Sequence, residues 1–170
     1  MLLWPIFQSK RAALRRKLHF YRIAGSSFGA ALGIGAVSYL AMATGWPLLT
    51  PSFGATGLIM AVIPDSAFAQ PRNVIGGHLF SSITGLLCLQ LLGSHWWSYM
   101  AAVGLAVLLM QLTRTVHPPA ASNPLFILLQ PRVEWGFLLM PVLASTVILI
   151  GTAWIYHNFI AKRSYPKHWV

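Results

Sequence analysis

The chain has 170 residues, of which 56% are hydrophobic and 8% are charged, and its formal net charge is +10. Soluble domains carry about 25% charged residues, so this composition excludes an ordinary soluble protein. Most basic residues stand near the two chain ends, where contact with an anionic membrane surface explains them better than nucleic acid does. They are Lys10, Arg11, Arg15, Arg16, Lys17, Arg22, Lys162, Arg163 and Lys167.

Residues 1–22, "MLLWPIFQSKRAALRRKLHFYR", predict a short basic helix in the membrane interface. Four later stretches are apolar and near the length of about 20 residues that a helix needs to cross a bilayer. They cover residues 23–45, 74–93, 97–112 with its flanks, and 135–156. The predicted fold class is an all-α membrane protein with four transmembrane helices. Four crossings put both chain ends on one side, the cytoplasmic side by the positive-inside rule.

The sequence also repeats itself. The tripeptide "QPR" occurs at 70–72 and 130–132, each time at the start of an apolar span. A short proline-led segment precedes each copy: "TPSFGATGLIMAVI" from Thr50 and "HPPAASNPLFILL" from His117. Aligning the two segments pairs Thr50 with His117 and Pro51 with Pro118. Each half of the chain therefore reads as span, short segment, QPR, span.

The short segments are interpreted as re-entrant half-helices, because about 13 residues of helix reach only about 20 Å of a core about 30 Å thick. This interpretation predicts two parallel repeats related by an axis along the membrane normal. If the segments crossed fully, the repeats would be inverted instead. The predicted units are the basic segment 1–22, span 1 with the first half-helix (23–72), span 2 (73–95), span 3 with the second half-helix (96–132), span 4 (133–158) and the basic tail 159–170.

The proline-led segments are also the candidate binding site. Proline suits the first helical turn, and the free N–H groups of a helix start favour anions. Two helix starts that face each other near mid-membrane would bind a small anion. The candidate substrate-binding residues are Thr50, Pro51, Ser52, Phe53, Gly54, Ala55, Arg114, His117, Pro118, Pro119, Ala120, Ala121, Ser122 and Asn123.

Several polar residues allow two readings. Arg114 either pairs with the anion or reaches out to the membrane surface. His117 either caps its helix or lines the path and titrates. Arg72 and Arg132 either bind the last carbonyls of the half-helices or steer anions. The residues given a structural or secondary role are Gln70, Pro71, Arg72, Asn73, His78, Gln130, Pro131 and Arg132. His78 is expected to face protein rather than lipid.

The sequence gives little support for other classes of function. The two acids, Asp65 and Glu134, lie at span boundaries, which disfavours cation transport. His117 has no cysteine or carboxylate at metal-ligand spacing, and the single Cys88 excludes an intrachain disulfide. No nucleophile–base pair or nucleotide loop is present. We therefore expect no enzyme activity, no metal and no cofactor. Gly25, Gly29 and Gly33 predict a close-packing helix face, inside the bundle or between subunits.

The segments "SFGAT" (52–56), "AQPRNVIGGH" (69–78), "VHPPAASNPL" (116–125) and the second QPR together resemble the HPP family of integral membrane proteins. The likeness covers residues 20–157 and implies a four-span fold. Cyanobacterial and plastid members of that family are associated with nitrite transport. The resemblance implies that His117, Pro118 and Pro119 are signature residues, with Gln70, Pro71, Arg72 and Asn73 in the upstream motif. Ala121 and Ser122 depart from the Gly-Ala that the family often has there.

These observations predict a transporter of a small monovalent anion, with nitrite as the expected substrate and nitrate or other small anions as alternatives. Its other partners would be the lipid bilayer and further copies of itself, because four spans are few for a complete pathway. The family resemblance implies a bacterial inner membrane or a plastid envelope. The rival hypothesis is a structural or regulatory membrane subunit that binds a protein or lipid and transports nothing.

Overall fold

The computed structural model describes residues 4–169, and side chains from residue 15 onward. This part of the chain is helical and contains no strand. The α-helices are α1 (Trp4–Thr44), α2 (Pro51–Val62), α3 (Pro71–Leu92), α4 (Trp96–Leu112), α5 (Asn123–Leu129) and α6 (Ala144–Ile155). Short 3₁₀ or π turns join or extend them: η1 (Ala67–Ala69), η2 (Pro118–Ser122), η3 (Trp135–Leu138), η4 (Leu139–Leu143) and η5 (Tyr156–Ile160).

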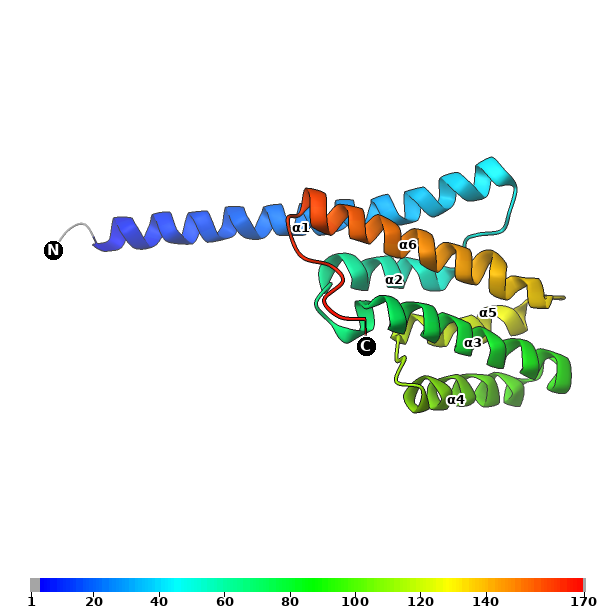
Figure 1. The fold of residues 1–170 in the computed structure, drawn as a ribbon. Coiled ribbons are helices and arrows are strands. Elements are labelled where there is room, and N and C mark those ends of the chain that lie inside the picture. Colours follow the sequence, from blue (N-terminus) through cyan, green and yellow to red (C-terminus); the bar gives the residue numbers. More distant parts are fainter. Residues whose placement is uncertain (1–3, 170) are drawn as a thin grey trace.

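The first helix is longer than the sequence predicted. The basic segment and the first span form one helix of 41 residues, and its beginning extends beyond the bundle (Figure 1). Residues 6–24 contain neither proline nor glycine, so nothing interrupts the helical hydrogen bonds at position 22. The interfacial segment and span 1 are therefore one continuous element.

Within the described residues, three helical stretches are long and apolar enough to cross a membrane: Arg15–Thr44, Pro71–Leu92 and Trp135–Ile160. The stretch predicted at 97–112 forms α4, whose 17 residues reach about 26 Å and fall short of that length. The stretch 135–156 is not one regular helix. Met140 has non-helical dihedral angles just before Pro141, which has no N–H to donate, so the regular α-helix begins only at Ala144.

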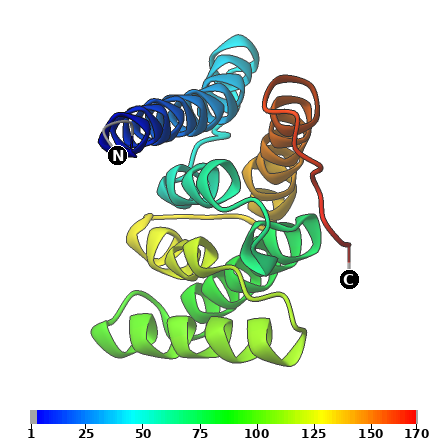
Figure 2. The same cartoon turned by 90° about the vertical axis from the view of Figure 1, so that its left-hand side faces the viewer.

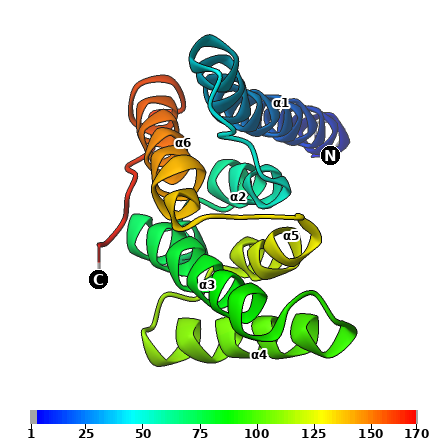
Figure 3. The same ribbon diagram turned by 90° about the vertical axis from the view of Figure 1, so that its right-hand side faces the viewer.

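Both proline-led segments form short helices at the predicted places. Pro51 opens α2, and Pro118 opens η2, which continues into α5. At one end of α2, Ser145 Oγ donates to Leu48 O; at the other, His157 Nε2 donates to Met60 O. α2 therefore runs alongside α6 in the same direction (Figures 1 and 3).

The second short helix runs the opposite way. Along α3, Gly77 lies against His117, Gly85 lies against Pro124, and Ser94 Oγ donates to Leu128 O. α5 is therefore parallel to α3, whereas α2 is antiparallel to α3 because a short connection joins them at one end. The two short helices are thus antiparallel to each other, and they lie side by side in the bundle (Figure 2).

This geometry corrects the predicted symmetry. In each half, the chain runs the length of the bundle three times, as α1–α2–α3 and as α4–α5–α6, and the QPR copies stand at opposite ends. The repeats are inverted rather than parallel. The short segments do not turn back to the end from which they came, because the non-helical residues 45–50 and 115–117 continue the passage that each short helix leaves unfinished.

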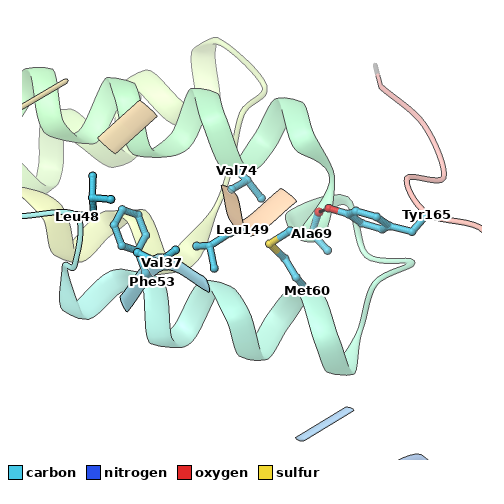
Figure 4. Packing of buried hydrophobic residues seen from close by; sticks show 8 residues of the cluster. All are labelled: Val37, Leu48, Phe53, Met60, Ala69, Val74, Leu149 and Tyr165. Atoms are coloured by element: carbon cyan, nitrogen blue, oxygen red, sulfur yellow. Dashed lines mark hydrogen bonds between the residues drawn. The ribbon is translucent and has the colours of Figure 1, made fainter. Parts of the chain in front are cut away.

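The hydrophobic core joins both halves. It comprises Val37, Leu48, Phe53, Met60, Ala69, Val74, Leu149 and Tyr165 (Figure 4). The glycine face of α1 packs inside the bundle: a Cβ on Gly29 would lie 2.7 Å from the Tyr156 ring, and one on Gly33 would lie 3.2 Å from Leu149. The C-terminal tail then folds back, and Tyr165 Oη donates to Ala69 O at 2.7 Å. The tail therefore lies at the same end of the bundle as the start of α3.

Candidate functional site: a buried histidine pair between the repeats

Four polar side chains from separate elements meet in the centre of the bundle. Thr56 comes from α2, His78 from α3, His117 from the residue before η2, and Asn123 from the start of α5. Their exposed fractions are 0%, 0%, 0% and 1%. The first repeat contributes Thr56 and His78, and the second contributes His117 and Asn123. We call these four residues the central cluster.

Thr56 joins the two histidines. Its Oγ1 lies 3.0 Å from His78 Nε2 and 2.9 Å from His117 Nε2, and it is also placed to donate to Ser52 O at 3.0 Å. The two imidazole rings lie 5.0 Å apart, centroid to centroid. One hydroxyl group therefore connects the two imidazoles, one from each repeat.

The outer nitrogens of both imidazoles are held as well. His117 Nδ1 donates to Phe68 O at 2.7 Å, because a carbonyl oxygen can only accept. His78 Nδ1 lies 3.1 Å from Asn123 Nδ2, which also donates to Ser82 Oγ at 2.8 Å. The remaining amide atom, Asn123 Oδ1, is buried without a hydrogen-bond partner. The cluster thus contains a free acceptor in a place where unpaired polar atoms are costly.

Glycines in α3 make this close meeting sterically feasible. A Cβ on Gly77 would lie 2.6 Å from His117 Cβ and 3.1 Å from Thr115 O, and one on Gly85 would lie 2.9 Å from Pro124 Cα. Real Cβ atoms essentially never come within 3.0 Å of such neighbours. The glycines before and after His78 therefore let the second proline-led segment lie directly against α3.

His117 does not cap its helix, and neither does Thr50, the aligned residue of the first segment. His117 precedes η2 and Thr50 precedes α2, but neither side chain accepts a hydrogen bond from the helix start. His117 turns to Phe68 and Thr56 instead, and Thr50 Oγ1 lies 2.8 Å from Ser52 Oγ. His117 therefore belongs to the polar centre of the bundle rather than to helix capping.

Of the other residues that were predicted to bind the anion, some are buried and others are exposed. In the first segment Ser52 and Phe53 are buried, whereas Pro51, Gly54 and Ala55 are exposed. In the second segment the buried residues are Pro119, Ala120 and Asn123, Ala121 and Ser122 are half-buried, and Pro118 is exposed. The two helix starts do not face each other across a shared pocket, because antiparallel helices carry their starts at opposite ends. The structure joins the segments through side chains near their middles.

The arginines lie at the bundle ends. Arg114 is exposed and has a φ of 54°, which ends α4 in the left-handed conformation. Arg72 Nη2 donates to Thr113 O at 3.1 Å, so it binds a carbonyl at the end of α4 rather than at the end of a half-helix. Asn73 Nδ2 donates nearby to Val116 O at 2.9 Å. Arg72 and Asn73 therefore hold the segment that leads to His117. Arg132 is exposed.

The two QPR copies differ in their surroundings. Gln70 is buried; its Nε2 donates to Pro64 O and Ser66 O, and its Oε1 accepts from the backbone N–H of Lys167. Pro71 is buried at the first position of α3. In the second copy Gln130 is half-buried, and Pro131 and Arg132 are exposed. Near the first copy, burial raises the pKa of the Tyr165 hydroxyl, so it remains a donor to Ala69 O at neutral pH.

A cavity of about 660 Å³ opens at the end of the bundle where α1 diverges from α6. Its lining includes Arg22, Arg163, Ala61, Tyr156 and His157. Gly57, Met60 and Ala61 of α2 line a small neighbouring cavity together with Tyr156 and His157. Two arginines give the mouth a positive potential.

Sequence reasoning missed Thr56 and gave His78 only a packing role. The signals were present: Thr56 aligns with Asn123 when Thr50 is paired with His117, and His78 follows two consecutive glycines. A polar residue at matching positions of two apolar repeats, and an imidazole inside an apolar span, each indicate a buried polar contact.

Long apolar helices, inverted repeats and a polar cluster sealed inside the bundle define a multi-pass helical integral membrane protein. The family model described as "HPP, transmembrane region" matches residues 15–166. The chain belongs to the HPP transmembrane family.

Two curated proteins of Dictyostelium discoideum, each described only as a transmembrane protein, are similar to this chain. One is 34% identical over 129 residues, covering 72% of this chain and 45% of its own length; the other is 33% identical over 128 residues, covering 71% and 41%. This chain spans less than half the length of these relatives. No solved structure matches it.

Proposed function

We propose that the protein transports a small monovalent anion across the membrane, with nitrite as the substrate. One observation carries the proposal: a polar cluster shared by two inverted repeats is buried in a bundle that otherwise consists of apolar helices. Buried polar groups at membrane depth are costly and generally mark solute pathways. Substrate sites of transporters commonly lie where short or broken helices of inverted repeats meet.

Charge favours an anion over a cation. The chain has two acidic residues, Asp65 and Glu134, and both are exposed at the ends of helices. A cation would find no carboxylate in the centre. The cavity with Arg22 and Arg163 would instead concentrate anions at its mouth. Nitrite as the substrate comes from the family resemblance.

Five further features belong to the same proposal. Besides the three long spans and the passages that include the short helices, α4 crosses the membrane despite its 17 residues, and both chain ends face the cytoplasm. The protein acts without enzyme chemistry and assembles as a homo-oligomer. Its membrane is a bacterial inner membrane or a plastid envelope.

The test is nitrite uptake into liposomes that contain the purified full chain. We expect uptake above that of protein-free liposomes, and its loss in His117→Ala. His168→Ala is the matched control, because His168 is exposed in the tail and its side chain lies outside the cluster. A well-folded protein that moves none of nitrite, nitrate, chloride or formate contradicts the proposal.

A thermal-shift assay with the same four anions tests whether the protein binds an anion at all, which the rival subunit is not expected to do. An anion at 100 times its Kd should stabilise the fold by about 2.7 kcal/mol. Absence of both stabilisation and uptake would favour the rival function, a structural or regulatory membrane subunit that binds a protein or lipid.

A further inference from the structure

We infer that the central cluster binds one proton together with the transported anion, so that transport is electroneutral proton–anion symport. This inference rests on the proposed function and names its coupling ion. It follows from counting the hydrogen atoms that the contacts of the cluster require.

Four contacts around Thr56 and His117 each need one hydrogen atom. They are His117 Nδ1 to Phe68 O, His117 Nε2 to Thr56 Oγ1, His78 Nε2 to Thr56 Oγ1, and Thr56 Oγ1 to Ser52 O. With every residue neutral, each imidazole supplies one hydrogen and the threonine hydroxyl supplies one. Three hydrogens are available for four contacts.

The neutral cluster therefore gives up one contact. His117 keeps its hydrogen on Nδ1 for Phe68, so Thr56 must donate to His117 Nε2, and Ser52 O loses its side-chain donor. One added proton completes the set: both histidines then donate to Thr56, and Thr56 donates to Ser52. His78 Nδ1 accepts from Asn123 Nδ2 in either case. The geometry is that of a site for one extra proton.

Among residues 15–169, whose side chains the structure describes, the added charge has no partner of opposite charge. Thr56, Ser52 and the residues of η1, η2 and α5 carry no ionisable side chain. α3, α4 and the turn that follows α6 carry the other titratable or charged groups nearby. These groups are Arg72 and Cys88 of α3, Tyr99 of α4, and Tyr156 and His157 after α6. Arg72 binds Thr113 O, and His157 binds Met60 O. Asp65 is exposed and lies 3.5 Å from Lys167.

A proton alone would thus create an unpaired positive charge in a buried site, and an anion alone would create an unpaired negative one. Each ion is costly by itself and each offsets the charge of the other. Thermodynamic linkage makes the effect reciprocal, so the anion raises the affinity for the proton by the same factor as the proton raises the affinity for the anion. The two ions should therefore bind and move together.

The experiment separates the two driving forces. Liposomes with the full chain are given a pH gradient alone, a membrane potential alone set with potassium and valinomycin, or neither. Nitrite uptake and internal pH, from a trapped fluorescent dye, are read together. We expect nitrite to follow the pH gradient with one proton entering per nitrite, and no response to the potential. Rates in protein-free liposomes are subtracted, because nitrous acid itself crosses lipid.

Thr56→Val removes the shared oxygen while keeping the shape of the side chain, and Thr56→Ser keeps the oxygen. We expect Val to abolish coupled uptake above background and Ser to retain most of it. Uptake that follows the potential without proton entry overturns the inference but leaves anion transport standing. Absence of uptake under every gradient overturns the proposed function itself. The wild-type stoichiometry decides the matter even if the valine variant does not fold.

Discussion

The two proline-led segments match in sequence but differ in structure and in the contacts that they make. In the first, α2 starts at once as an α-helix, and Gly54 and Ala55 lie on its exposed side. In the second, a 3₁₀ turn precedes a helix of only seven residues, which packs closely on α3. Their aligned residues diverge too, since His117 reaches the cluster whereas Thr50 stays beside Ser52.

One aligned pair of residues contacts the same side chain. Thr56 and Asn123 hold equivalent positions, and both contact the imidazole of His78, one at each ring nitrogen. The comparison indicates that the repeats share one polar position near the middle of each segment, whereas the residues at the starts of the two segments make different contacts. The predictions below test this division, from the largest expected effect to the smallest.

Removing the shared hydroxyl should have the largest effect. Thr56→Val leaves the Nε2 atoms of His78 and His117 without a partner, and each buried unpaired polar group costs about 1–3 kcal/mol. We expect a lower unfolding temperature in detergent and loss of nitrite uptake. Thr50→Val is the control, because Thr50 Oγ1 contacts only Ser52 Oγ among the hydrogen bonds described. Equal effects of the two variants would contradict the central role of Thr56.

A glycine-to-alanine substitution should destabilise the fold more where the second segment packs on α3 than it does in α2. In Gly77→Ala the new Cβ would lie 2.6 Å from His117 Cβ and 3.1 Å from the Thr115 carbonyl, and overpacking costs about 1–3 kcal/mol. Gly57→Ala is the matched change on α2, where the nearest atom would be 3.7 Å away. Thermal unfolding should show a clear loss for the first and little change for the second. A stable Gly77→Ala protein would place the second segment farther from α3.

The two QPR copies should respond differently to the same substitution. Gln70→Ala removes a side chain that donates to Pro64 O and Ser66 O and accepts from the N–H of Lys167, at a cost of about 1–3 kcal/mol. It should also release the C-terminal tail, which faster proteolytic removal of that tail would report. Gln130→Ala should change both measurements little, because Gln130 is half-buried. Equal proteolysis of the two variants would show that Gln70 does not hold the tail.

The smallest effect is expected at Arg114. Its left-handed φ of 54° disfavours a side chain, so Arg114→Gly should stabilise the fold by up to about 1 kcal/mol. Nitrite uptake should stay unchanged, because Arg114 is exposed at the end of α4. Loss of anion selectivity would restore Arg114 as a contact of the anion. Unfolding temperature and uptake, measured on the same preparation, decide between these outcomes.

The sequence by itself determined the local features of the protein. Its composition identified a membrane protein, and Pro51, Pro71 and Pro118 marked where helices or 3₁₀ turns begin. These predictions succeeded because hydropathy and the missing N–H of proline act on the residues where they occur. The prediction of one helix at residues 135–156 did not take the missing N–H of Pro141 into account, and the helix is interrupted there.

Only the tertiary structure decided how the repeats are related and which side chains meet. A helix of 12 residues is compatible with turning back or with running on, and its direction is set by packing against α6, which is far away in the sequence. The same packing brings Thr56 and His117, 61 positions apart, to 2.9 Å. Contacts at that separation depend on the combined shape of several helices, such as the surface left open by Gly77, and no local pattern contains that information.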